Sequence, residues 1–159
     1  MPRIYIHRFT IAVDAIDALG HVNNLRYLDW MLDIATQHST AQGWPLERYL
    51  AEAAGWVVRS HFISYKRPAF EADAIALLTW VDSFKPRGSL RKFLFWRLAD
   101  RHVLAQAETE WAYVDFKTGR PRPIPEALRS SFEVVPDAAE VLRLAEAGCL
   151  PTPPLPGEA

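Results

Sequence analysis

The chain has 159 residues, half of them hydrophobic, and a formal charge of −1. This length suffices for one well-buried core and is short for two domains, and the near-neutral charge argues against a nucleic-acid-binding protein. No apolar run approaches the ~20 residues that a membrane-spanning helix needs, so we expect no membrane insertion, and the N-terminus lacks the apolar segment of a signal peptide. The single cysteine, Cys149, cannot form an internal disulfide, so a cytoplasmic location is expected.

Two elements are predicted in the first quarter of the chain. Residues 4–13 are rich in β-branched and aromatic side chains, which predicts a strand. Apolar residues then recur at helical spacing, which predicts one long helix at 24–42. Asn23 or Asn24 is the expected N-cap of this helix.

Four β-rich runs follow the helix, at residues 56–66, 74–84, 89–99 and 103–116. Short turns join these runs, so we expect them to form an antiparallel meander. The helix has to bury its apolar stripe, and a curved sheet is the partner that the pattern offers. The sequence therefore predicts an α+β fold, with a five-stranded antiparallel sheet wrapped around one long central helix.

The composition changes after residue 116. A proline-rich exit at 118–125 precedes two short predicted helices at 125–131 and 137–147. Residues 150–159 contain four prolines and are expected to form a loose tail. We expect one domain over residues 1–135 and a C-terminal helical extension with a proline-rich tail over 136–159.

The most informative motif is Asp17-Ala-Leu-Gly-His-Val-Asn-Asn24, just ahead of the predicted helix. The first N–H groups of a helix have no partner within the helix, and they carry a positive partial charge. A carboxylate beside such donors can attack a carbonyl or activate a water, while the donors hold the oxyanion. The alternative for Asp17 is an ordinary turn or capping aspartate, although it lies several residues ahead of the helix.

The chain resembles the hotdog-fold acyl-CoA thioesterases of the 4-hydroxybenzoyl-CoA thioesterase type over roughly residues 3–135. The resemblance rests on the Asp17–Asn24 motif with Tyr27, and on Tyr65-Lys-Arg-Pro68, Asp73, Gly88-Ser89, Asp115 with Thr118-Gly-Arg-Pro121, and Ile124-Pro125. It implies the hotdog fold, homodimers with joined sheets that often pair into homotetramers, and active sites at the subunit interface.

The same resemblance implies the roles of the motif residues. Asp17 is the expected catalytic aspartate, and the main-chain N–H of Asn24 is expected to polarise the thioester carbonyl. His21 either orients a water or the substrate carbonyl, or is a structural loop histidine. The chain departs from the family at Ala15, where many relatives carry an aspartate, and at Leu19, where some acyl-carrier-protein thioesterases have an asparagine.

An acyl-CoA substrate carries phosphates, so basic groups are expected at the mouth of its groove. The candidate substrate- and CoA-binding residues are Tyr27, Lys66, Arg67, Lys85, Arg87 and Ser89. Packing is the alternative for Tyr27, and a solvated surface turn is the alternative for each cation. No cofactor or metal is predicted, because the sequence lacks a phosphate-binding glycine loop, a His-Glu-x-x-His motif and a Cys-x-x-Cys pair.

Together these features predict an acyl-CoA thioesterase that hydrolyses an acyl-CoA thioester to a free carboxylate and coenzyme A. Three alternatives stay open. These are a thioesterase for acyl-carrier protein, a non-catalytic hotdog module that binds thioesters, and a hotdog dehydratase. A dehydratase needs a histidine and an acid paired across the interface.

Overall fold

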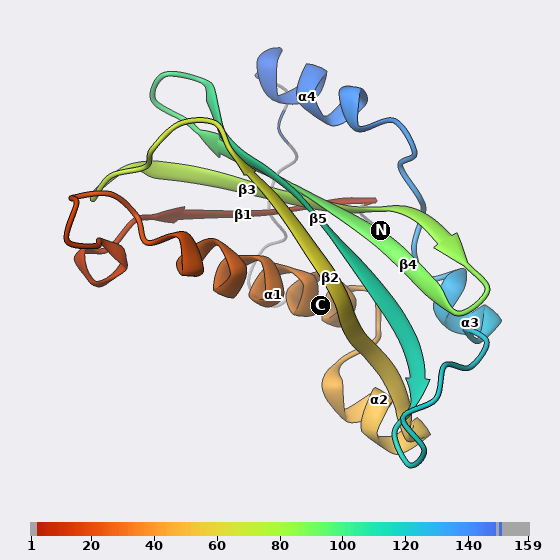
Figure 1. The fold of residues 1–159 in the computed structure, drawn as a ribbon. Coiled ribbons are helices and arrows are strands. Elements are labelled where there is room, and N and C mark those ends of the chain that lie inside the picture. Colours follow the sequence, from red (N-terminus) through yellow and green to blue (C-terminus); the bar gives the residue numbers. More distant parts are fainter. Residues whose placement is uncertain (1–2, 149, 151–159) are drawn as a thin grey trace.

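The computed structural model describes residues 3–148 and 150 (Figure 1). One antiparallel sheet contains β1 (Ile4–Thr10), β2 (Ala54–Tyr65), β3 (Ala74–Lys85), β4 (Gly88–Arg97) and β5 (His102–Asp115). The helical elements are η1 (Val13–Ala15), α1 (Asn24–Ala41), α2 (Leu46–Glu52), α3 (Glu126–Arg129) and α4 (Ala138–Glu146). The 18-residue helix α1 lies along one face of the curved sheet, which confirms the predicted α+β fold. Cys149 and the predicted tail at 151–159 lie outside the described residues.

The strand order is β1-β3-β4-β5-β2, so the prediction of a four-stranded meander is wrong. Only β3, β4 and β5 follow one another, whereas β2 pairs with β5 at the edge of the sheet. The connection at 66–73 explains the difference, because it runs across the end of the sheet. Lys66 N–H donates to the carbonyl of Leu104 on β5, and the carbonyl of Pro68 accepts from Arg97 on β4.

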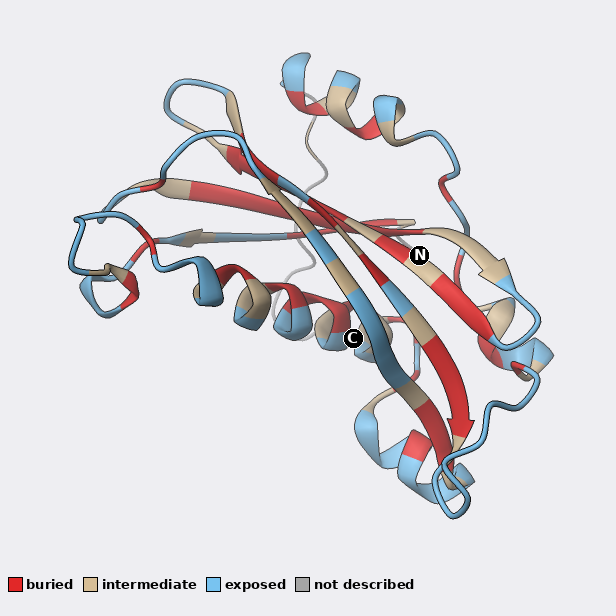
Figure 2. Ribbon diagram, viewed as in Figure 1, coloured by how far each residue is buried: buried red, intermediate tan, exposed pale blue. Residues whose placement is uncertain are grey.

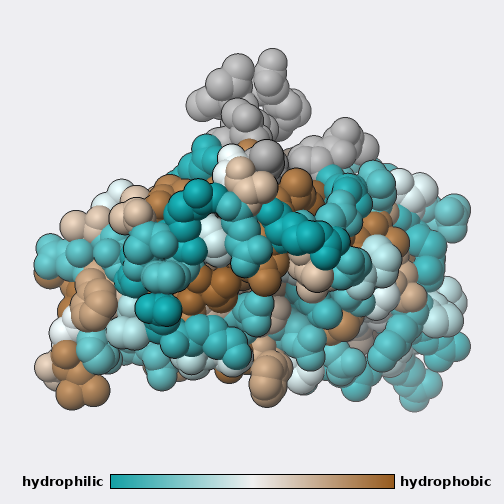
Figure 3. All heavy atoms as spheres, turned by 90° about the horizontal axis from the view of Figure 1, so that it is seen from above, coloured by the Kyte–Doolittle hydropathy of each residue, from teal (hydrophilic) through white to brown (hydrophobic). Residues whose placement is uncertain are grey.

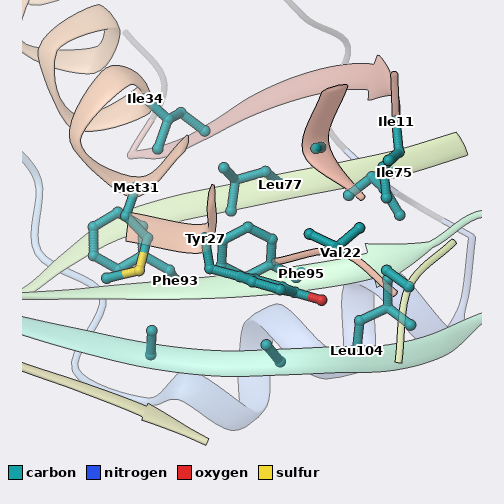
Figure 4. Packing of buried hydrophobic residues seen from close by; sticks show 14 of the residues in the cluster. Ile11, Val22, Tyr27, Met31, Ile34, Ile75, Leu77, Phe93, Phe95 and Leu104 are labelled. Carbon is teal, nitrogen blue, oxygen red and sulfur yellow. The ribbon is translucent and has the colours of Figure 1, made fainter. Parts of the chain in front are cut away.

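The helix α1 begins and packs as its sequence pattern predicts. The Asn23 side chain is the N-cap and accepts a hydrogen bond from Leu25 N–H at 2.9 Å. The buried side of the helix packs against aromatic and aliphatic side chains of β3 and β4 (Figure 4). This cluster includes Tyr27, Met31, Ile34, Leu77, Phe93 and Phe95.

Helix α4 covers the opposite face of the sheet (Figure 1). Its Val141 and Ala145 are buried with Leu94 and Trp96 of β4. Alternate residues of β4 therefore face two different cores, because successive side chains of a strand point to opposite faces of the sheet. Seen from the side of α4, the described residues form a largely hydrophilic surface with smaller hydrophobic areas (Figure 3). The domain boundary after residue 135 stays a prediction.

Strand β2 is more exposed than the strands at the centre of the sheet, and Figure 2 shows much of it in pale blue. Several of its apolar side chains face solvent, with Val57 41% exposed and Phe62 66% exposed. Its outer edge pairs with no described strand. A long edge strand with exposed apolar side chains is a site for association with another chain.

Candidate active site

A short hairpin connects Asp17 to the start of α1. Ile16 and Val22 form an isolated antiparallel bridge. Asp17 N–H donates to the carbonyl of His21 at 2.8 Å, and Asn23 N–H donates to the carbonyl of Ala15 at 2.8 Å. The chain therefore folds back on itself between the candidate acid and the helix.

The Asp17 carboxylate is half-buried and held at one oxygen. Its Oδ1 accepts hydrogen bonds from the main-chain N–H groups of Leu19 at 2.9 Å and His21 at 3.3 Å. Its Oδ2 has no hydrogen-bond partner among the residues that the structure describes. One oxygen thus fixes the orientation of the carboxylate, and the other is available to a ligand.

Asn24 is the first residue of α1. Its main-chain N–H has no acceptor within residues 3–148 and 150, as expected at the open end of a helix. The neighbouring groups are held in place, because Asn23 caps Leu25 and the Tyr65 hydroxyl donates to the carbonyl of Asn24 at 3.1 Å. The structure therefore presents a free donor on a well-supported helix start.

Arg97 was not predicted, but it fixes the connection at 66–73 that contacts the Asp17 hairpin. Its Nη1 donates to Asp73 Oδ2 at 3.0 Å and to the carbonyl of Pro68 at 3.2 Å, while its Nη2 donates to Asp100 Oδ2 at 2.8 Å. This hydrogen bond with Arg97 lowers the pKa of Asp100. In the same connection, the carbonyl of Ala69 accepts a hydrogen bond from Val22 N–H of the hairpin. Arg97 therefore also stabilises the hairpin.

The main-chain N–H of His21 contacts Asp17, whereas the imidazole ring of His21 does not. The exposed imidazole lies edge-on against Phe70, with the ring centroids 5.5 Å apart. The ring makes no hydrogen bond within the described part of the chain. This arrangement fits a loop histidine, and a catalytic role for His21 stays a prediction.

Tyr27 lies in the core beneath the sheet. Its side chain is 3% exposed and packs against the rings of Trp30, Tyr65 and Phe95. Burial raises the pKa of Tyr27 to about 12, so the phenol stays protonated at neutral pH. The position of Tyr27 therefore fits a role in packing better than direct contact with the substrate.

Lys85, Arg87 and Ser89, all predicted to bind CoA, line one groove at the turn between β3 and β4. Arg59 also lines this groove and was not predicted. It lies at an irregularity in the pairing of β2 with β5, which a strand pattern does not reveal. The groove is not purely basic, because Lys85 Nζ lies 3.5 Å from Glu110 Oε1.

Lys66 and Arg67 lie at the other end of the sheet. Both donate main-chain hydrogen bonds to Leu104 near the start of β5, whereas the carbonyl of Arg87 accepts from Tyr113 near its end. Nine residues of strand separate these two positions on β5, a distance of about 30 Å at ~3.4 Å per residue. The predicted CoA-binding cations therefore form two groups that are far apart within one chain.

The sequence profile of the Thioesterase-like superfamily matches residues 11–132. The chain belongs to the thioesterase-like superfamily. This membership confirms the predicted enzyme class, a thioester hydrolase. No curated protein matches the chain in sequence.

Solved structures share the fold of this thioesterase-like chain. A candidate oleoyl thioesterase from Lactobacillus plantarum has a TM-score of 0.77 at 22% identity, and the match covers 83% of this chain and 52% of that protein. A 1,4-dihydroxy-2-naphthoyl-CoA thioesterase from Synechocystis has a TM-score of 0.74 at 12% identity, covering 80% and 94%. A Staphylococcus aureus protein in complex with CoA has a TM-score of 0.76 at 14% identity, covering 98% and 90%. This chain spans about half the length of the Lactobacillus protein. At these identities the likeness shows the hotdog fold alone.

In this thioesterase-like chain, the hairpin that carries the Asp17 carboxylate leads directly to a helix start with a free N–H. Neither Asp17 nor Asn24 lines the groove that contains Lys85, Arg87 and Ser89. Within the described ranges, no group of three or more His, Cys, Asp or Glu side chains is placed to hold a metal ion. No described helix is both long enough and apolar enough to cross a membrane.

Proposed function

We propose that this chain is a cytoplasmic acyl-CoA thioesterase that acts as a homodimer or homotetramer. The observation that carries the proposal is the half-buried Asp17, which has one anchored oxygen and one free oxygen and lies in the hairpin that leads to a free N–H donor at the start of α1. Membership of the thioesterase-like superfamily supports the reaction class. The CoA bound by the Staphylococcus aureus structure supports coenzyme A as the thiol.

Two routes use the same groups. In the first, Asp17 Oδ2 attacks the thioester carbon, the C–S bond breaks, and water then hydrolyses the resulting acyl anhydride. In the second, Asp17 takes a proton from a water that attacks the carbon directly. In both routes the carbonyl oxygen becomes an oxyanion, which the Asn24 N–H stabilises. The coenzyme leaves as a thiolate and is protonated by solvent.

Pairing of two chains through β2 explains the divided set of cations. A two-fold axis that joins two β2 edges sets the strands antiparallel. The end with Lys66 and Arg67 in one protomer then approaches the end with Lys85 and Arg87 in its partner. One CoA bound at the joint is within reach of both groups, whereas the distance within one chain keeps them apart.

Thiol release from a graded panel of acyl-CoAs, aromatic ones included, tests this function. We expect turnover with at least one acyl group and at least tenfold lower kcat/KM for the same acyl group on acyl-carrier protein. The reverse preference would assign the chain to acyl-carrier-protein hydrolysis. If the folded dimer releases no thiol from any member of the panel, the chain is a non-catalytic hotdog module.

A further inference from the structure

A second site lies toward the other end of α1, in a pocket of about 180 Å³. Its walls come from α1, α2, β2, β3, β4 and β5, and from the segment that follows α3. Aromatic side chains supply much of the wall, including Trp44, Trp56, Trp111 and Phe132. Arg91 also lines this pocket, which we call the Arg91 pocket.

Arg91 is a buried cation with no carboxylate partner among the described residues. The residue is 7% exposed, and no described acidic side chain forms a salt bridge with it. Its Nη1 lies 3.0 Å from His38 Nδ1 and donates to Thr79 Oγ1 at 3.1 Å. Its Nε and Nη2 have no hydrogen-bond partner within residues 3–148 and 150.

The charge on Arg91 persists despite its burial. Desolvation lowers the pKa of Arg91 to about 10, which is still above neutral pH, so the side chain is cationic at pH 7. A buried charge without an opposite charge is costly, because it has lost its hydration. A ligand that supplies the missing negative charge would offset this cost.

The rest of the lining points to the same kind of ligand. The indole Nε1–H of Trp111 is buried without an acceptor in the described part of the chain. The buried Ser89 also lines the pocket, and its hydroxyl has no described hydrogen-bond partner. No aspartate or glutamate is among the described lining residues. The part of the pocket formed by described residues therefore offers spare donors and no negative charge.

We propose that the Arg91 pocket binds the carboxylate of a small organic acid whose apolar body is about the size of one aromatic ring. A carboxylate accepts two hydrogen bonds from a guanidinium in a planar, charge-assisted geometry. The aromatic walls suit a flat apolar body. The size also fits, since an engineered apolar cavity of about 150 Å³ holds benzene.

This site is separate from Asp17 within one chain. Thr36 and Ser39 of α1 line the pocket, and Thr36 lies twelve residues beyond Asn24, or about 18 Å along the helix at ~1.5 Å per residue. The proposal therefore goes beyond the proposed function and does not depend on a catalytic Asp17. The carboxylate comes either from a free acid or from the far end of an acyl group that also carries a thioester.

Calorimetric titration of the full-length protein with benzoate and with phenylacetate tests the proposal, with benzamide as the uncharged match. We expect one of the two acids to bind about tenfold or more tightly than benzamide, because the ionic hydrogen bonds to Arg91 are absent from the amide. Arg91→Met should abolish this preference for the acid. Trp111→Phe, which removes a single N–H and keeps an aromatic wall, should weaken acid binding a few-fold. The wild-type comparison of acid with amide stands even if Arg91→Met does not fold.

Inhibition of thiol release separates the two sources of the carboxylate. Competitive inhibition by the bound acid supports a pocket for the end of the acyl group, and binding without competition supports a site for a free acid. Absence of thiol release, with acid binding intact, would overturn the proposed function and leave this proposal standing. Failure of both acids to bind, equal binding of benzamide, or unchanged acid binding by folded Arg91→Met would overturn it.

Discussion

The hydroxyl of Tyr65, the last residue of β2, donates a hydrogen bond to the main-chain carbonyl of Asn24, the first residue of α1, at 3.1 Å. This bond connects the exposed edge strand to the helix start that carries the free donor. A change in the pairing of β2 is therefore expected to reach the candidate active site directly.

Tyr65→Phe tests this connection. The change removes one partly exposed hydrogen bond, so the free energy of unfolding should fall by about 1 kcal/mol or less. Turnover should fall several-fold, because the helix start loses a support. Tyr5→Phe is the matched control, since Tyr5 stacks on His38 away from the helix start. Equal effects of the two changes on kcat would show that the bond to Asn24 has no role in the site.

The main-chain N–H of Asn24 can be removed with little disturbance to the helix. Proline is well tolerated at the first helical position, and Asn23 already has the extended backbone (φ −60°, ψ 131°) that a residue before proline adopts. Asn24→Pro should fold and lower kcat by about 10²–10³, the usual effect of losing one oxyanion donor. Asn24→Ala keeps the N–H and should retain most activity. A folded, fully active proline variant would exclude this N–H as the donor.

We expect a charged substitution on β2 to dissociate the proposed dimer into monomers. Phe62 is 66% exposed, and Phe62→Glu places a charge on the surface expected to meet the partner. We expect a monomer by analytical ultracentrifugation and a loss of thiol release. Leu50→Glu, at a residue on α2 that is 59% exposed, should leave both unchanged. An active Phe62→Glu monomer would contradict a site shared between two chains.

The sequence predicts best what is decided locally. The helix expected at 24–42 is observed at Asn24–Ala41, because a capping asparagine, an apolar stripe and a following glycine all mark it. The helix expected at 137–147 is observed at Ala138–Glu146. The hairpin motif at Asp17 was also found from sequence alone, since its residues are neighbours in the chain.

What was missed depends on residues that are far apart in sequence. Strand order depends on the connection at 66–73, whose composition does not reveal that it crosses the sheet. Arg97 and Arg91 look like ordinary polar residues in a β-rich run. Their roles come from Asp73 and Thr79 on neighbouring elements, so no spacing in the sequence identifies them. Arg59 joins the basic groove only through the irregular pairing of β2.

His61 is expected to make the fold sensitive to mild acid. It lies on β2, where its Nδ1 is 2.7 Å from Thr109 Oγ1, and burial lowers the pKa of its imidazole below the usual 6.5. The unfolded chain therefore binds the proton more readily, and the stability from neutral His61 is present above about pH 6.5 and is lost as the pH falls through the folded pKa.

Denaturant titrations at pH 7.5 and pH 5 measure this effect. Wild type should lose more unfolding free energy between the two pH values than His61→Asn, which keeps an acceptor near Thr109 and does not titrate. The comparison with this variant cancels the effect of the other histidines. Equal losses in the two proteins would show that His61 is not an acid-sensitive group.

The most direct test of the account is the rate of thiol release by Asp17→Asn beside wild type and Asp14→Asn. An asparagine at position 17 keeps an oxygen for the N–H groups of Leu19 and His21, so the hairpin should persist. Asp14 is an exposed acid in the same segment, 3.5 Å from Arg26. We predict that kcat of Asp17→Asn falls by about 10²-fold or more, with acyl-CoA binding retained and Asp14→Asn close to wild type. A folded Asp17→Asn protein with near-normal kcat would contradict the central claim.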